Sequence, residues 1–144
     1  MRKIDTIILH CADTEEGQDF TVFDIDRWHK QRGWICVGYH YVIRLDGTVE
    51  HGRPEEAVGA HCLHQNHNSL GICYIGGRRN GHFTDTRTPA QLASMEKLVK
   101  QLLQKYPDAR VCGHHDFNAE KACPCFDARA WARSAGIAEK NILP

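Results

Sequence analysis

The sequence predicts an α/β fold, a single domain in which helices flank a mixed central β-sheet. Short apolar runs rich in β-branched residues recur at residues 5–10, 37–43 and 69–75, and each run suits a strand. Segments with helical periodicity lie between and after these runs, as expected when helices cover a sheet. The chain has 144 residues, enough to bury one core, so we expect residues 1–144 to form one domain.

The first third of the chain supplies a strand, a helix and a hairpin. The run at 5–10 suits a strand buried on both faces. Residues 21–33 change to helical spacing, with a threonine as N-cap at the start and a glycine as the stop. Asp46-Gly47 then separates two strand-like runs, 37–43 and 48–51, and this dipeptide is a strong hairpin signal.

The middle of the chain alternates loop, strand and connection. Residues 52–68 have little periodicity and are rich in Gly, His, Asn and Glu, which predicts a long surface loop of the kind that carries function. Residues 69–75 return to a strand. Residues 76–87 are polar and contain glycines, so we expect a solvated connection there.

The last third begins with a clear helix signal. Thr88-Pro89-Ala90-Gln91 combines an N-cap, a proline at the first helical position and a capping box, so a helix is expected from there to Tyr106. A short strand at 110–112 follows. A final helix is expected at 127–136, with Trp131 facing the core.

Composition excludes several classes of partner. The 18 basic and 18 acidic residues balance, so nothing in the charge favours nucleic acid or an anionic membrane. The amino-terminal apolar run is too short for a signal peptide or a membrane span, which favours the cytoplasm. The seven cysteines are scattered singly and are an odd number, so we expect free thiols in a reducing compartment.

One segment, residues 112–127, has the composition of a reactive loop. It contains the pair His114-His115, then Lys121 and Cys123, among residues that disfavour a helix. An imidazole nitrogen and a thiolate are two of the ligands that zinc prefers, but two ligands do not hold a metal.

A third ligand is available at the end of the first predicted strand. His10 lies there, and the strand that ends at Cys112 leads to His114, so both could meet at one edge of the sheet. With Cys123 they would leave a fourth zinc position for water, the pattern of a catalytic site. The alternative at this point is that His10 is only a hydrogen-bonded histidine at a strand end.

The loop at 52–68 raises a second metal possibility. It carries Cys62, His64 and His67, but these are loosely spaced and lack a fourth partner, so we do not expect them to form a cluster. Cys125 is expected only to pack.

Six motifs occur in the order of a known family. They are the segments 10–14 (HCADT), 37–41 (VGYHY), 46–50 (DGTVE), 57–61 (AVGAH), 66–71 (NHNSLG) and 114–127. Over residues 4–131 the chain resembles the zinc-dependent N-acetylmuramoyl-L-alanine amidases, most of all the short phage lysozymes that are amidases by chemistry. Peptidoglycan recognition proteins are more distantly similar.

The resemblance implies a role for each site residue. By position, the zinc ligands fall on His10, His114 and Cys123, the catalytic residues on Tyr39 and Lys121, and a substrate-binding cleft histidine on His61. One residue more than in the phage enzymes separates the histidine pair from Lys121, so His115 is an alternative to His114 as ligand. The Gly113-His114 dipeptide favours His114.

The implied function is hydrolysis of the amide bond between N-acetylmuramic acid and L-alanine in bacterial peptidoglycan, with one zinc ion per chain. We expect a monomer that reaches the cell wall only after release by another protein; the sequence leaves a regulatory partner open. Alternatives are a non-catalytic module that binds muropeptide and a small zinc-stabilised interaction protein. Cys123, Tyr39 and Lys121 together favour catalysis.

Overall fold

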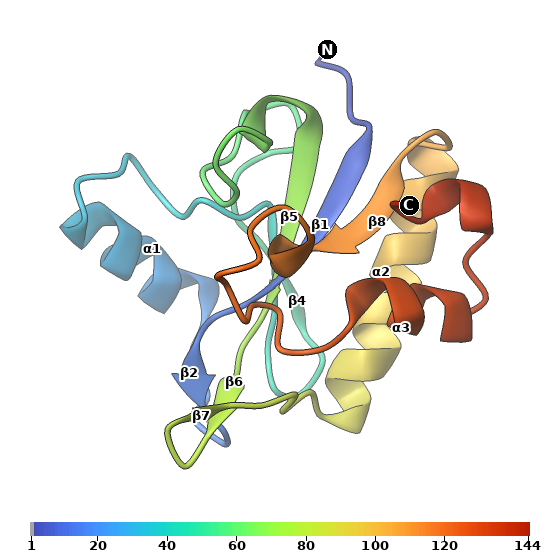
Figure 1. Cartoon of the computed structure of the whole chain (residues 1–144). Coiled ribbons are helices and arrows are strands. Elements are labelled where there is room, and N and C mark those ends of the chain that lie inside the picture. The colour runs from blue at the N-terminus through green and yellow to red at the C-terminus, as the bar shows by residue number, and fades with distance from the viewer. Residues whose placement is uncertain (1) are drawn as a thin grey trace.

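A five-stranded mixed sheet is the centre of the computed structural model, which describes residues 2–144 (Figure 1). The strand order is β4-β3-β5-β1-β8, with bounds β1 (Thr6–Cys11), β3 (Tyr41–Ile43), β4 (Val49–His51), β5 (Ser69–Tyr74) and β8 (Arg110–Gly113). All neighbouring pairs are parallel except the β3–β4 hairpin. The predicted fold class is therefore confirmed.

Helices cover both faces of this sheet (Figure 1). The helices are α1 (Val22–Gln31), α2 (Pro89–Lys105) and α3 (Ala128–Ser134), with short 3-10 turns η1 (Asn66–Asn68), η2 (His114–Asp116) and η3 (Glu139–Asn141). The capping box predicted for α2 is present: Thr88 Oγ1 accepts from the Gln91 amide at 3.0 Å, and Gln91 Oε1 accepts from the Thr88 amide at 2.9 Å. Trp131 of α3 packs, partly buried, against the core as expected.

Alternation along β1 separates the core from the site. Ile7 and Leu9 pack into the large cluster that includes the apolar face of α2. Because side chains of a strand alternate, Ile8 and His10 point to the opposite face, where Ile8 contacts Cys112. His10 is thus held by a rigid strand on the side away from α2.

The connection at 76–87 differs from the expectation. It contains β6 (Gly77–Arg79) and β7 (His82–Phe83), which with β2 (Thr14–Glu15) form a second, three-stranded sheet. These strands are two or three residues long, too short to carry an apolar alternation that a sequence pattern could reveal. Ion pairs from Arg78 to Asp13 and from Arg79 to Glu16 link β6 to the segment around β2.

The first arm of the predicted hairpin is shorter than expected. Only Tyr41–Ile43 is regular strand, because the residues before it bond to the loop 52–60 instead of continuing the ladder. The Arg53 amide donates to Tyr39 O and the Ala60 amide to Gly38 O. Tyr39 therefore lies in a bend just before β3.

No helix within residues 2–144 has the length and apolar character needed to cross a membrane.

Candidate active site

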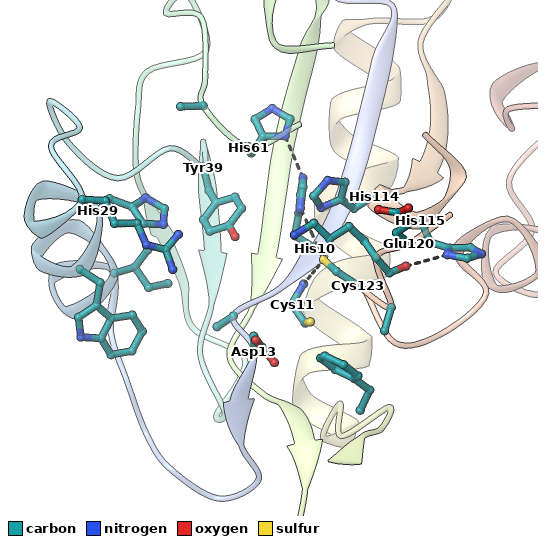
Figure 2. Close-up of a pocket in the computed structure, with 18 of the residues that line it drawn as sticks. His10, Cys11, Asp13, His29, Tyr39, His61, His114, His115, Glu120 and Cys123 are labelled. Carbon is teal, nitrogen blue, oxygen red and sulfur yellow. Dashed lines mark hydrogen bonds between the residues drawn. The ribbon is translucent and has the colours of Figure 1, made fainter. Parts of the chain in front are cut away.

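A groove of about 840 Å³ runs across the sheet edge between α1 and the loop that follows β8 (Figure 2). The end of β1 forms its floor, and all six residues named as site candidates line it: His10, Tyr39, His61, His114, Lys121 and Cys123. This volume lies within the usual range for a small-molecule site, roughly 300–1,000 Å³.

Neighbouring strand ends bring the two histidines together. Leu9 of β1 pairs with Gly113, the last residue of β8. His114 therefore leaves the sheet beside His10, which is still part of β1 and pairs with Cys73 of β5. Their ring centroids are 4.8 Å apart. Cys123 returns to them from the following loop, and one ligand atom from each of the three residues lies within 4.8 Å of the others.

The spacing of these donors fits zinc. His10 Nδ1 lies 3.6 Å from Cys123 Sγ. Zn–N and Zn–S bonds of about 2.05 and 2.3 Å at a tetrahedral angle place a nitrogen and a sulfur ligand ~3.6 Å apart. Burial lowers the pKa of His10 well below its usual value, which keeps the imidazole neutral, the form that binds a metal.

His115 has a different role from its neighbour. Its side chain is exposed, and its Nδ1 donates to Lys121 O at 2.7 Å. Its amide donates to Cys123 O at 2.9 Å. His115 therefore braces the loop, and of the two histidines only His114 belongs to the donor group within residues 2–144.

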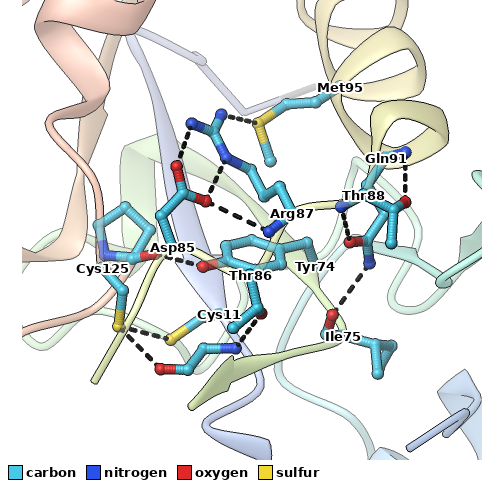
Figure 3. A network of polar contacts seen from close by, with 12 residues as sticks. Cys11, Tyr74, Ile75, Asp85, Thr86, Arg87, Thr88, Gln91, Met95 and Cys125 are labelled. Carbon is cyan, nitrogen blue, oxygen red and sulfur yellow. Dashed lines mark hydrogen bonds and ion pairs between the residues drawn. The ribbon is translucent and has the colours of Figure 1, made fainter. Parts of the chain in front are cut away.

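Contacts from several elements anchor Cys123 and the residues after it. The Cys11 amide donates to Cys123 Sγ at 3.2 Å. Tyr74 Oη donates to Pro124 O at 2.7 Å. The Arg87 guanidinium lies 3.3 Å from the ring centroid of Phe126. It also bonds Asp85 (Figure 3).

Tyr39 and Lys121 approach the groove from different elements. The Tyr39 ring centroid lies 5.1 Å from that of His10, on the α1 side of the groove (Figure 2). Burial raises the pKa of Tyr39 well above its usual value, so its hydroxyl keeps its proton and can donate. Lys121 is exposed on the opposite loop, two residues before Cys123.

His61 lies behind His10, where both of its ring nitrogens already face protein atoms. Its Nδ1 is 2.8 Å from His10 Nε2 (Figure 2), and its Nε2 is 3.2 Å from Ser69 Oγ. Burial lowers the pKa of His61 to about 3, so the ring is neutral near pH 7. The sequence had suggested a substrate-binding role for this residue.

Two arginines hold the loop that carries His61. Arg2 Nε donates to Glu55 O at 3.0 Å, and its Nη2 donates to Ser69 O at 2.9 Å. Arg53 donates to Val37 O and Val58 O, both at 2.8 Å. The predicted long functional loop at 52–68 is therefore tied down at both its beginning and its end.

Sequence reasoning missed the far wall of the groove. It is built from one face of α1 and the turn after it, and comprises Ile25, Trp28, His29, Arg32 and Trp34. His29 is buried, and its Nδ1 accepts from the Gly38 amide at 2.9 Å. A histidine on an otherwise apolar helical stripe was the available signal.

The second metal cluster considered for the loop 52–68 does not form. Cys62 is buried against Ile8 and Cys112, whereas His64 and His67 are exposed. Within residues 2–144, the one group of three or more metal-binding side chains is that of His10, His114 and Cys123.

A mixed β-sheet flanked by helices, with two imidazoles and a thiol at the edge of an open groove, fits the class of α/β hydrolases with a candidate metal site. The sequence model of the N-acetylmuramoyl-L-alanine amidases matches residues 1–126, and the chain belongs to this family. The resemblance read from the six motifs is thereby confirmed, and so is the amidase activity it implied.

Curated relatives and solved structures agree. The endolysin of Escherichia phage T7 is 48% identical over 128 residues, which cover 88% of this chain and 84% of that protein. The endolysin of Enterobacteria phage K11 is 42% identical over 130 residues, or 90% and 85% of the two chains. The N-acetylmuramoyl-L-alanine amidase LysC from Clostridium intestinale URNW superposes with a TM-score of 0.79 at 31% identity, covering 95% of this chain and 88% of LysC.

Proposed function

We propose that the chain cleaves the amide bond between N-acetylmuramic acid and L-alanine of peptidoglycan with one zinc ion held by His10, His114 and Cys123. The observation that carries this proposal is the 3.6 Å separation of His10 Nδ1 and Cys123 Sγ beside a second imidazole, in a groove open to substrate. When bound, zinc supplies Lewis-acid chemistry: it polarises the scissile carbonyl and lowers the pKa of water towards about 7.

Tyr39 and Lys121 complete the reaction from the two sides of the groove. The protonated Tyr39 hydroxyl donates a hydrogen bond to the attacking water or to the oxyanion that develops on the carbonyl. The exposed Lys121 ammonium is tethered two residues from Cys123 and supplies positive charge at the same oxyanion. Removing one such donor typically costs ~100- to 1000-fold in rate.

Recognition without cleavage is the rival function. The peptidoglycan-recognition protein SC2 of Drosophila melanogaster is 33% identical over 73 residues, 51% of this chain and 38% of that protein. Binding alone does not require a thiol beside two imidazoles, nor Tyr39 and Lys121 in the same groove. Their presence together supports catalysis, and we further propose a monomer that acts on the wall after release by another protein.

The decisive experiment identifies the bond that breaks. Purified cell walls digested with the zinc-loaded protein should yield stem peptides with new L-alanine amino termini, measured by mass spectrometry. The glycan should gain free lactyl carboxylates and no new reducing ends, because a glycosidase would need paired carboxylates that this groove does not use. Stem peptides cut internally but still joined to sugar would contradict the assignment; binding without any cleavage would favour the recognition function.

A further inference from the structure

The two ring nitrogens of His10 face different partners. Its Nδ1 faces Cys123 Sγ at 3.6 Å, and its Nε2 faces His61 Nδ1 at 2.8 Å. If Nδ1 binds a metal, the ring proton must sit on Nε2. His10 then donates to His61, and His61 Nδ1 is the acceptor.

Because His10 donates this hydrogen bond, the position of the proton on the His61 ring is determined as well. With its Nδ1 accepting, the proton of a neutral His61 sits on Nε2, which donates to Ser69 Oγ at 3.2 Å. Ser69 is fully buried on β5. Two hydrogen bonds therefore run in one direction from the metal site into the sheet.

The surrounding backbone leaves space for the His61 ring and holds it in one position. A Cβ at Gly71 would lie 2.7 Å from His61 Cγ, and a Cβ at Gly59 would lie 2.7 Å from His61 Cδ2. The amide of His61 and that of Cys62 both donate to Asn66 Oδ1 at 2.9 Å. Two glycines make room for the ring and an asparagine holds its backbone, so the imidazole stays behind His10.

We propose that His61 is a positioning residue that orients His10 for zinc, and not a substrate-binding residue. Metal-binding histidines nearly always donate their second ring N–H to a fixed acceptor, and loss of that acceptor typically weakens metal binding about 10- to 100-fold. Here the acceptor is a neutral imidazole. Unlike a carboxylate, it adds no negative charge behind the ligand, so it orients His10 while leaving the metal strongly electrophilic.

The inference rests on the proposed zinc site, and a matched pair of variants tests it. His61→Asn places an amide group near the position of Nδ1 and keeps an acceptor for His10. His61→Gln places its amide nearer the position of Nε2, so it can reach Ser69 but not His10. Both side chains are polar and similar in size, and circular dichroism with urea unfolding verifies that each variant folds.

The readout is the zinc dissociation constant, measured by competition with a chromophoric chelator and without substrate. We expect His61→Gln to bind zinc about 10- to 100-fold more weakly than the wild type and His61→Asn to stay close to it. His67→Gln, at an exposed histidine of the same loop, should have no effect. At saturating zinc, KM should stay near the wild-type value in both His61 variants.

Other outcomes separate the two proposals. Equal, wild-type zinc affinity in His61→Asn and His61→Gln, with a raised KM in both, would overturn the positioning role and restore substrate binding. Equal loss of zinc affinity in both would also overturn it, because a general packing defect would then explain the effect. A wild-type chain that binds no zinc would overturn the zinc site itself.

Discussion

The back and front of the groove are built in opposite ways. At the back, His10 and His61 are buried, lie on or against strands, and have each ring nitrogen assigned to a partner. At the front, residues 118–122 form an exposed loop, and residues 119–122 line the groove. If His10 belongs to the metal site as proposed and Lys121 acts on the substrate, the two regions have separate tasks, and substitutions in them should fail differently.

The largest effect should follow loss of a ligand. Cys123→Ser replaces the thiolate with a hydroxyl, which zinc binds poorly, so we expect the metal content measured by atomic absorption to fall to near zero and activity to vanish with it. Cys125→Ser is the matched control two residues away, because its sulfur contacts Cys11 Sγ and Gly77 O and not the metal site. Equal zinc in both variants would contradict the ligand assignment.

The next largest effect should leave the metal in place. Lys121→Ala and Tyr39→Phe each remove a group that acts on the developing oxyanion, and kcat should fall ~100- to 1000-fold in each. Zinc content and thermal stability should match the wild type. Lys100→Ala, at an exposed position of α2, controls for loss of a surface charge. Turnover near the wild-type value in both variants would mean that Tyr39 only packs and that Lys121 is only a hydrated surface lysine.

A smaller effect should distinguish the adjacent histidines. His115→Ala removes the Nδ1 bond to Lys121 O, a single exposed hydrogen bond worth about 0.5–1.5 kcal/mol, so kcat should fall roughly 2- to 10-fold with zinc retained. His114→Ala should lose zinc. Metal analysis of the two variants side by side checks this, and loss of zinc only from His115→Ala would reverse the assignment.

The smallest effect concerns the anchor of the front loop. Arg87→Met keeps most of the side chain but removes the charge above the Phe126 ring and the ion pair with Asp85. We expect urea denaturation to show a loss of about 1–2 kcal/mol in the free energy of unfolding, with kcat little changed. Arg110→Met, at an exposed position on β8, should cost less. Equal losses in the two variants would mean that the stacked guanidinium adds nothing to the free energy of unfolding.

Local signals predicted the fold well where they were strong. The apolar run of β1 indicates a strand, and the capping box at Thr88 indicates the start of a helix, each from a few neighbouring residues. The strands β6 and β7 were missed because segments of only two or three residues, paired through backbone bonds, are too short to show a side-chain pattern. The bend at Tyr39 was missed because its partners lie in the loop 52–60.

The site was predictable for a related reason. His10 lies near the end of β1 and His114 directly follows β8, so the order of strands and histidines suggested that they meet, and Cys123 follows His114 closely in sequence. The surroundings of His61 were not predictable, because its partners His10 and Ser69 lie 51 and 8 residues away and contact it only in the folded chain. The wall from α1 was likewise visible only once Trp28 and His29 were seen to face the groove.

The Arg2 clamp has a practical consequence for preparing the protein. One guanidinium near the amino terminus bonds Glu55 O and Ser69 O, and so ties the first residues to both ends of the loop that carries His61. Trimming by a peptidase past Arg2 would release that tie without touching the groove. A sample with a ragged amino terminus would then mix chains with and without this tie, so an intact-mass spectrum taken before any assay shows which form is being measured.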